Sequence, residues 1–241
     1  MIGYRARLGF MVPPGNPTIE PELIALTPPG VSVHFNRMVA RGVTGSLDGQ
    51  EERNRMMFES LDECIEMLAQ VKPDIAVLAH TATSYTLGRE REAELLARLT
   101  AKTGIPVVSA YACVVAALER LGVRRLALGA PYSAQTTAQG RAHLESFGYT
   151  VVRSDNLKDI ANIYDCTAED AYRLARSVDV PEAQAVFLSG TGMPTLPVLE
   201  MLEQDLGKPV LSSNAALMWH ALRSCGVRQP TPGYGRLLTL D

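Results

Sequence analysis

The chain has 241 residues, of which 46% are hydrophobic and 20% are charged, and its formal net charge is −3. This composition is typical of a globular protein with one large or two small domains, and it is not that of a disordered chain. The negative balance and the lack of a Lys/Arg run argue against nucleic acid as a partner. No apolar stretch approaches the ~18 residues of a membrane span. The apolar run at residues 8–12 is too short for a signal peptide, so we expect a cytoplasmic protein with no membrane partner.

Cysteine and histidine usage gives no sign of disulfides or of a metal site. The four cysteines show no CxxC spacing, and Cys64, Cys113 and Cys225 lie in helix-like apolar patterns that predict burial. The four histidines are not at metal-ligand spacing. We therefore predict a reducing compartment and no bound metal.

Apolar runs and helical spacing alternate along the chain and predict an α/β fold. Strands are predicted at residues 7–12, 31–38, 74–79, 125–129 and 150–154. Helices are predicted at residues 51–70, 89–100, from 133 to about 147, and 167–176. Thr167 is the predicted N-cap of the last of these, with Asp170 at N3.

The second half of the chain repeats the pattern of the first. Residues 76–87 (AVLAHTATSYTL) and 104–125 correspond to residues 185–196 (AVFLSGTGMPTL) and 207–228. Each copy contains an apolar strand, a small hydroxyl-rich loop, a helix, a strand after Gly-x-Pro-Val, and a helix that ends at Gly-Val-Arg. Loops at the carboxyl ends of parallel strands are where open α/β sheets bind ligands. We therefore expect the two loops to face one shared cleft.

The first loop, residues 80–84, follows a buried strand and precedes a helix. Its N–H groups and the hydroxyls of Thr81, Thr83 and Ser84 lie at a helix N-terminus, where anions bind. A simpler role for Thr83 or Ser84 is to cap that helix. His80 is either a packed strand-end residue or a catalytic group, and its place in a duplicated cleft favours catalysis.

The second loop, residues 189–192 (Ser-Gly-Thr-Gly), has no bulky side chain. Ligand oxygens can therefore approach the amides of Thr191 and Gly192 directly. The third glycine of a dinucleotide-binding motif is missing, because Thr195 stands in its place, so we expect no nicotinamide cofactor. Ser189 is not in a Gly-x-Ser-x-Gly motif, which leaves a hydrolase unsupported.

Further donors follow other predicted strands. Asn16 lies in the proline-rich segment PPGNPTIE, where it either donates to a carboxylate or forms an Asx turn before Pro17. Tyr132 offers a phenolic hydroxyl after a strand end, and Asn162 offers an amide unless it is a turn residue. Pro14 is among the residues expected to shape the pocket.

These loops, together with other segments, resemble the aspartate/glutamate racemase superfamily, and within it the arylmalonate decarboxylases and the maleate cis–trans isomerases. Asn16, Thr18, Glu20 and Glu22 are similar to the Asn-Thr-x-x-Glu-x-Glu run of the isomerases. Segments similar to the decarboxylase are 12–14 (VPP), 121–125 (LGVRR), 207–213 (GKPVLSS) and 232–237 (PGYGRL). The resemblance implies two pseudo-symmetric flavodoxin-like parallel-sheet domains, no cofactor, and an active site in the cleft between them. We place one domain at 1–111 plus 213–241 and the other at 112–212.

The chain departs from these families at both catalytic cysteines. The racemases and isomerases carry a cysteine in each loop, whereas the decarboxylase keeps only the second and has glycine in the first. Here the two positions are His80 and Gly190, so neither a two-thiol racemisation nor a cysteine adduct is expected.

The resemblance also implies which donors remain. Thr81 and Tyr132 match donors around the carboxylate that becomes an enediolate in the decarboxylase, and Thr191 and Gly192 match its loop amides. Asn16 and Asn162 are similar to the carboxylate-binding asparagines of the isomerases. Ala82 stands where the decarboxylase has a serine, so one donor is lost.

From these residues we predict a cofactor-independent enzyme that acts on a small mono- or dicarboxylic acid through an enediolate-like intermediate. A malonate-type decarboxylase with His80 as proton donor is favoured, because a single protonation suits a site with one acid–base group. The alternatives are an isomerase or racemase of a small carboxylate, and a non-catalytic carboxylate-binding protein. Thr81 and Tyr132 join His80 in the predicted catalytic set, and the oligomeric state stays open, a homo-oligomer included. The predicted substrate-binding residues are Pro14, Asn16, Ala82, Thr83, Asn162, Gly190, Thr191 and Gly192.

Overall fold

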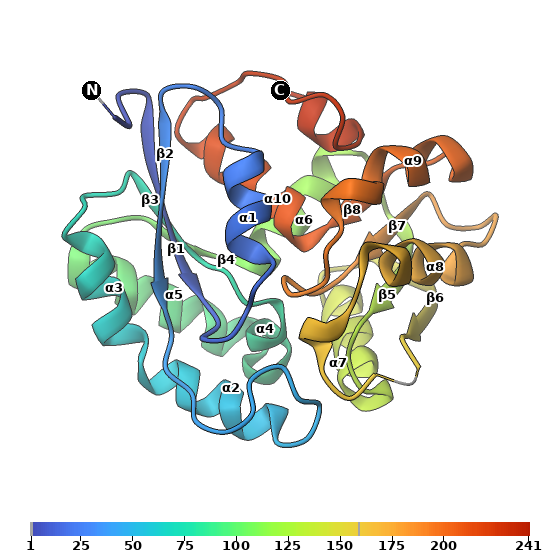
Figure 1. Cartoon of the computed structure of the whole chain (residues 1–241), viewed down its shortest axis with the longest axis horizontal. Coiled ribbons are helices and arrows are strands. Elements are labelled where there is room, and N and C mark those ends of the chain that lie inside the picture. Colours follow the sequence, from blue (N-terminus) through green and yellow to red (C-terminus); the bar gives the residue numbers. More distant parts are fainter. Residues whose placement is uncertain (1, 159) are drawn as a thin grey trace.

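Two four-stranded parallel sheets organise the computed structural model, which describes residues 2–158 and 160–241 (Figure 1). The first sheet has the order β2-β1-β3-β4, and the second has the equivalent order β6-β5-β7-β8. The repeat in the sequence is therefore a repeat of topology, and the predicted α/β class is confirmed. The strands are β1 (Ala6–Val12), β2 (Val31–Arg37), β3 (Ile75–Leu78), β4 (Val107–Ser109), β5 (Arg125–Ala130), β6 (Thr150–Asn156), β7 (Ala185–Leu188) and β8 (Val210–Ser212).

Helices cover the sheets and fill the space between the two halves. In Figure 1, α6 and α10 lie at the centre of the molecule, with α1 beside α10. The helices are α1 (Ile19–Ala25), α2 (Gln50–Glu59), α3 (Leu61–Ala69), α4 (Thr81–Leu87), α5 (Arg89–Thr103), α6 (Ala110–Arg120), α7 (Ala134–Ser146), α8 (Ala168–Val178), α9 (Leu196–Leu206) and α10 (Ser213–Ser224). Two 3₁₀ helices, η1 (Ile163–Asp165) and η2 (Arg236–Thr239), complete the elements.

The central strands carry the core. β3 (IAVL) and β7 (AVFL) are buried along their whole length, as expected for continuous apolar runs inside a parallel sheet. Gly9 in β1 and Gly129 in β5 are equivalent points of close helix packing. A Cβ at Gly9 would lie 2.8 Å from the side chain of Leu68, and one at Gly129 would lie 2.9 Å from Leu174. In each half, a helix therefore packs closely against a strand at a glycine, where no side chain lies between them.

The chain differs from the sequence prediction in two helical segments. The single helix predicted at residues 51–70 is two helices, α2 and α3, which meet at Ser60. The Ser60 hydroxyl donates to the Met57 carbonyl and accepts from the Val39 amide, so it serves the loop after β2. Helix α1 was not predicted, because its segment is rich in proline. Pro21 fits there, since the N–H groups of a first helical turn need no helical partner.

Other local predictions agree with the structure. Thr167 caps α8 in a reciprocal capping box with Asp170, as the sequence indicates. Cys64 and Cys113 are buried as predicted, whereas Cys225 is partly exposed at the end of α10. The division into domains at 1–111 plus 213–241 and 112–212 stays a prediction.

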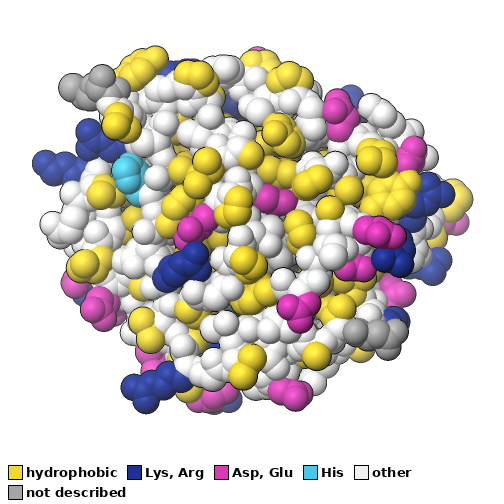
Figure 2. Space-filling view, in the orientation of Figure 1, with side chains coloured by type: hydrophobic (Ala, Val, Ile, Leu, Met, Phe, Trp, Pro, Cys, Tyr) yellow, Lys and Arg dark blue, Asp and Glu magenta, His cyan; other side chains and the backbone are white. Residues whose placement is uncertain are grey.

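The surface carries charges of both signs. Figure 2 shows acidic, basic and apolar side chains interspersed over one face, with no single-sign patch on that face. Among residues 2–158 and 160–241, no helix combines the length and the apolar character that crossing a bilayer requires.

Candidate active site

The first loop was predicted at residues 80–84, after β3. Only His80 lies outside a helix there, because Thr81–Ser84 form the first turn of α4; the name first loop is kept for residues 80–84. His80 has an extended backbone and is the N-cap residue of α4, and its side chain is 7% exposed. Its Nδ1 lies 2.8 Å from the hydroxyl oxygen of Thr83. Burial lowers the pKa of His80 to about 4, so the imidazole is neutral at neutral pH. The predicted capping of α4 by Thr83 or Ser84 is wrong, because Thr83 contacts His80 and the Ser84 hydroxyl donates to the carboxylate of Glu92.

The second loop begins where β7 ends and holds its backbone in an unusual conformation. Gly190 has φ +109°, which L side chains rarely adopt. The Gly190 amide donates to the Ser213 hydroxyl oxygen at 3.1 Å. By contrast, the amides of Thr191 and Gly192 donate to no group in the part of the chain that the structure describes. Two adjacent N–H groups therefore have no hydrogen-bond partner in the described chain, and their role in binding ligand oxygens stays a prediction.

Ser213 joins the two loops. The Thr81 hydroxyl of the first loop donates to Ser213 Oγ at 3.0 Å, and the Gly190 amide of the second loop donates to the same oxygen. Thr81 and Gly190 therefore contact the same atom, the hydroxyl oxygen of Ser213. Ser213 was not among the predicted site residues. The signal for it was the Ser-Ser pair after Gly-x-Pro-Val in the second copy of the repeat.

Asn16 reaches the second loop from the other half of the chain. Its Oδ1 accepts from the amides of Thr18 and Ile19, which is an Asx-type turn. Its Nδ2 donates to the Thr191 hydroxyl at 3.1 Å. The turn that was one alternative for Asn16 is therefore present, and its role as a donor to a carboxylate stays a prediction.

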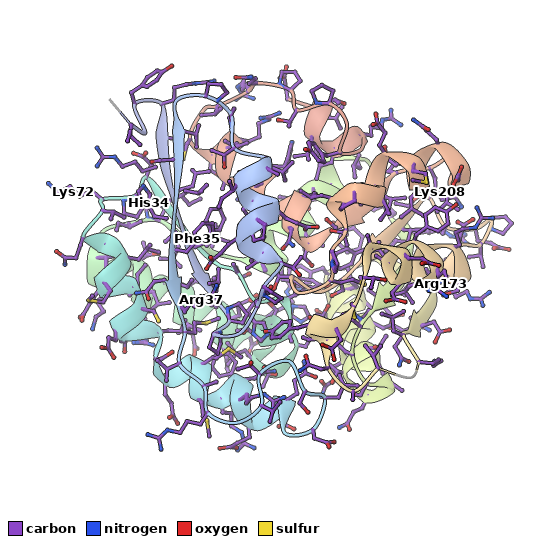
Figure 3. The ribbon with its side chains drawn as sticks, viewed as in Figure 1. His34, Phe35, Arg37, Lys72, Arg173 and Lys208 are labelled. Atoms are coloured by element: carbon purple, nitrogen blue, oxygen red, sulfur yellow. The ribbon has the colours of Figure 1, made fainter. Side chains whose placement is uncertain are left out.

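The segment before Asn16 is held by Arg37, which lies at the end of β2 (Figure 3). The guanidinium donates to the carbonyls of Pro13 and Pro14, at 3.2 and 2.9 Å, and pairs with Glu20 at 2.7 Å. Pro14 is thus fixed at the carboxyl end of β1 through its carbonyl.

Tyr132 lies against both loops. It follows β5, is 1% exposed, and packs with Ala82 of the first loop and with Ile163. A Cβ at Gly190 would lie 3.1 Å from the Tyr132 hydroxyl oxygen, so glycine leaves room for the phenol. Burial raises the pKa of Tyr132 well above its ordinary value, which keeps the phenol protonated and able to donate.

Asn162 serves the backbone in this structure. Its Nδ2 donates to the Thr44 carbonyl at 2.9 Å, and its Oδ1 accepts from the Tyr164 amide as the cap of η1. The turn role considered for Asn162 is therefore present, and its amide joins the two halves of the chain. Two main-chain bonds add to this link, from Ile163 to Gly45 and from Leu47 to Ala161.

The structure thus gathers most of the predicted residues around the ends of β1, β3, β5 and β7, and Asn162 at the edge of that group. The assembled groups are one neutral imidazole, one neutral phenol, threonine hydroxyls and two unpaired amides. The predicted set includes no carboxylate or thiol side chain. Such a set of donors suits an organic anion better than a metal ion. The residues that the sequence prediction missed, Thr18, Glu22, Ser213 and Asn214, all support the second loop from outside it.

Comparison with known proteins agrees with this geometry. The family model for arylmalonate decarboxylase matches residues 8–238. The chain is 29% identical over 250 residues to a maleate isomerase of Geobacillus stearothermophilus, with 97% of each chain covered. It is 30% identical over 192 residues to an arylmalonate decarboxylase of Bordetella bronchiseptica, covering 75% of this chain and 78% of the relative. A Nocardia farcinica maleate cis–trans isomerase variant with a covalently bound succinylcysteine intermediate superposes with a TM-score of 0.87, at 27% identity over 98% of this chain and 99% of that one. The chain therefore belongs to the arylmalonate decarboxylase family.

Proposed function

We propose that the protein is a decarboxylase of a small malonate-type acid and that His80 donates the proton. The observation that carries the proposal is the shared contact at Ser213, which sets Thr81 beside Gly190. His80 precedes Thr81, and the two unpaired amides follow Gly190. These contacts support a site in which an acid–base group and two amides serve one substrate.

The reaction follows from these groups. The bond between the α-carbon and one carboxylate breaks and CO2 leaves, while the electron pair passes into the retained carboxylate to give an enediolate. The amides of Thr191 and Gly192 and the hydroxyl of Tyr132 would stabilise its oxygens. The Thr81 hydroxyl would join them by turning its single proton from Ser213 to the substrate. Each such donor contributes on the order of 2.7–4 kcal/mol in comparable oxyanion holes. A proton from His80 then adds to the α-carbon.

His80 can deliver that proton because of its contacts. When the Thr83 hydroxyl donates to Nδ1, the single proton of the neutral ring is on Nε2. A bound substrate carboxylate would raise the pKa of the ring and favour the imidazolium form. Since His80 is on the first loop, the proton would reach the substrate face opposite to that used by an acid on the second loop. A chiral product would accordingly have the opposite configuration.

A second candidate is an isomerase of a small dicarboxylate. The full-length similarity to maleate isomerase, at 29% identity over 97% of each chain, favours it. Neither loop has a cysteine, so such a reaction would need His80 to act with another group.

Incubation with phenylmalonate, methylmalonate, maleate and a panel of amino acids separates these functions. The proposal expects release of CO2 from a malonate and uptake of one solvent deuteron per turnover in D2O. Conversion of maleate to fumarate without CO2 would support the isomerase. Thermal stabilisation by a carboxylate without any turnover would indicate a binding protein and overturn both.

A further inference from the structure

Glu22 is a buried residue of the first half of the chain whose side chain contacts residues of the second half. It lies on α1 in the first half and is 7% exposed. Its Oε1 accepts from the amides of Thr195 and Leu196, at 2.6 and 2.9 Å, at the start of α9. Its Oε2 accepts from Nδ2 of Asn214, at 2.7 Å, in the first turn of α10. One side chain therefore fixes the ends of two helices that flank the second loop.

Glu22 is balanced by N–H groups and not by a cation. Within residues 2–158 and 160–241, no Lys, Arg or His forms an ion pair with it. Burial raises its pKa, and the hydrogen bonds from Asn214, Leu196 and Thr195 lower it. Three N–H groups and the Thr195 hydroxyl donate to the carboxyl group, so both of its oxygens act as acceptors. The N-terminal dipole of α9 is thus already engaged by Glu22 and is not free for a substrate.

Asn214 passes this constraint to the second loop. The same Nδ2 that donates to Glu22 also donates to the Thr191 carbonyl at 3.1 Å. The Thr191 carbonyl and the Gly192 amide belong to one planar peptide, in which C=O and N–H point in opposite directions. Fixing the carbonyl toward Asn214 therefore fixes the Gly192 N–H on the opposite side of this peptide.

A second tie from the first half acts on the next peptide. The Thr18 hydroxyl donates to the Gly192 carbonyl at 2.9 Å. Both carbonyls of this stretch are thus held, one by Thr18 and one through Asn214, while the Gly192 amide between them has no partner in the described chain.

We propose that Glu22 is a positioning residue, which holds Asn214 and the first turn of α9 so that the Gly192 amide is set for the substrate oxyanion. The inference rests on the proposed function for the reaction served, and it rests on contacts of the described residues for the positioning itself. Its consequence is that transition-state stabilisation depends on a carboxylate that does not touch the substrate.

The substitution Glu22→Gln tests this at nearly constant shape. The new side-chain NH2 would face the NH2 of Asn214. If Asn214 turned around to avoid this, its Oδ1, which has no hydrogen-bond partner in the described structure, would face the Thr191 carbonyl. In the first arrangement the two NH2 groups repel each other and displace Asn214, and in the second Asn214 has no donor toward Thr191. In both, the hydrogen bond to the Thr191 carbonyl is lost. We expect kcat to fall about 10²-fold, with a smaller change in KM, because displaced catalytic donors cost rates of this order.

The matched control is Glu200→Gln, on α9, the helix whose first turn Glu22 binds. Glu200 is exposed on the surface and belongs to no part of the proposed site, so its loss should change kcat less than twofold. A second readout is the amide spectrum of ¹⁵N-glycine-labelled protein. Glu22→Gln should shift or broaden the Gly192 signal and weaken malonate binding measured by calorimetry. The control should leave the signal and the binding unchanged.

The outcomes separate this inference from the proposed function. Folded Glu22→Gln with an unchanged Gly192 signal and unchanged malonate binding would overturn the inference. If no malonate is decarboxylated by the parent protein, the proposed function fails, and the Gly192 signal still decides the role of Glu22. Should Glu22→Gln not fold, Thr18→Val removes the tie on the Gly192 carbonyl at a partly exposed site. That variant should shift the same signal, and an unshifted signal would refute the inference.

Discussion

The imidazole of His80 is held by the hydroxyl of Thr83, with 2.8 Å between Nδ1 and Oγ1. The contact lies within the first turn of α4, so the ring is fixed to the helix that the first loop begins. Because Nδ1 is occupied, Nε2 is the nitrogen left to face a substrate.

Replacing His80 by alanine should lower turnover by roughly 10²–10⁴-fold, the usual contribution of a general acid or base. Malonate binding measured at pH 8 should change little, because the loop amides and hydroxyls remain and the ring contributes little charge at that pH. Steady-state kinetics and calorimetry measure the two effects. His34→Ala is the matched control, since His34 lies on edge strand β2 and its Nε2 is 2.9 Å from the Ser32 hydroxyl oxygen. Unchanged turnover in the His80 variant would return this histidine to the role of a packed strand-end residue.

Stability should fall on the acid side because of His80. Its pKa is about 4 in the folded protein and 6.5 ordinarily, so the unfolded chain binds more protons between these values. The contribution to the free energy of unfolding is therefore complete above pH 6.5 and is lost as the pH falls to 4, by about 3 kcal/mol. Glu22 and Glu92 act in the opposite sense, because burial raises the pKa of both.

The contribution of His80 is isolated by comparing the protein with His80→Gln in urea unfolding at several pH values. The difference in free energy of unfolding should shift by about 3 kcal/mol between pH 7 and pH 4, in the direction that penalises the parent protein at low pH. If the free energy of unfolding changed equally with pH in the two proteins, the assignment of His80 as a buried neutral ring would be contradicted.

Carboxylate binding should be accompanied by proton uptake. The ring is neutral before binding, and a neighbouring carboxylate favours its charged form. Calorimetry of malonate binding at pH 6, in buffers that differ in ionisation enthalpy, should therefore give a net uptake of up to about one proton. The uptake should vanish in His80→Gln. Equal heats in all buffers for the parent protein would indicate that the neutral ring is the proton donor.

Gly190→Ala should destabilise the protein and reduce malonate binding. A residue other than glycine at φ +109° costs of order 1–3 kcal/mol, and the new Cβ would lie 3.1 Å from the Tyr132 hydroxyl and 3.2 Å from Pro131. Urea unfolding measures the loss, with Gly207→Ala as a control that has positive φ but no nearby atom at its Cβ position. A similar loss in both variants would show that backbone strain, and not contact with Tyr132, sets the cost.

The repeat in the sequence predicted a duplicated strand–loop–helix unit with two facing loops, and the family resemblance added the expectation of two equivalent sheets. Predictions from hydrophobic periodicity and helix propensity were wrong where contacts between residues distant in sequence decide the structure. Residues 51–70 have one helical pattern, but α2 ends before Ser60, which is its C-cap. The Ser60 hydroxyl accepts a hydrogen bond from the amide of Val39, 21 positions away. Helix α1 was not predicted because its segment is rich in proline, although the first turn of a helix tolerates proline.

The site was predictable to the extent that its residues follow strand ends. His80, Asn16 and Tyr132 could be placed for that reason. The residues that support the second loop could not, because their partners are remote: Glu22 meets Thr195 across 173 positions, and Thr18 meets Gly192 across 174. Thr18 and Glu22 did stand out in the isomerase-like run at residues 16–22, but that resemblance did not indicate which residues they contact.

Activity should survive thiol alkylation and chelation. Neither loop contains a cysteine, and a thiol reacts as its thiolate. Burial raises the pKa of Cys166 to about 12 and that of Cys225 to about 11, and it raises the pKa of Cys64 and of the fully buried Cys113 as well. Native protein incubated with iodoacetamide at pH 7.5, or dialysed against EDTA, should therefore keep its turnover, with alkylation of urea-unfolded protein as the positive control for the reagent. Rapid loss of turnover under native conditions, protected by malonate, would place a cysteine in the site and refute the assignment of His80 and Gly190 to the two cysteine positions.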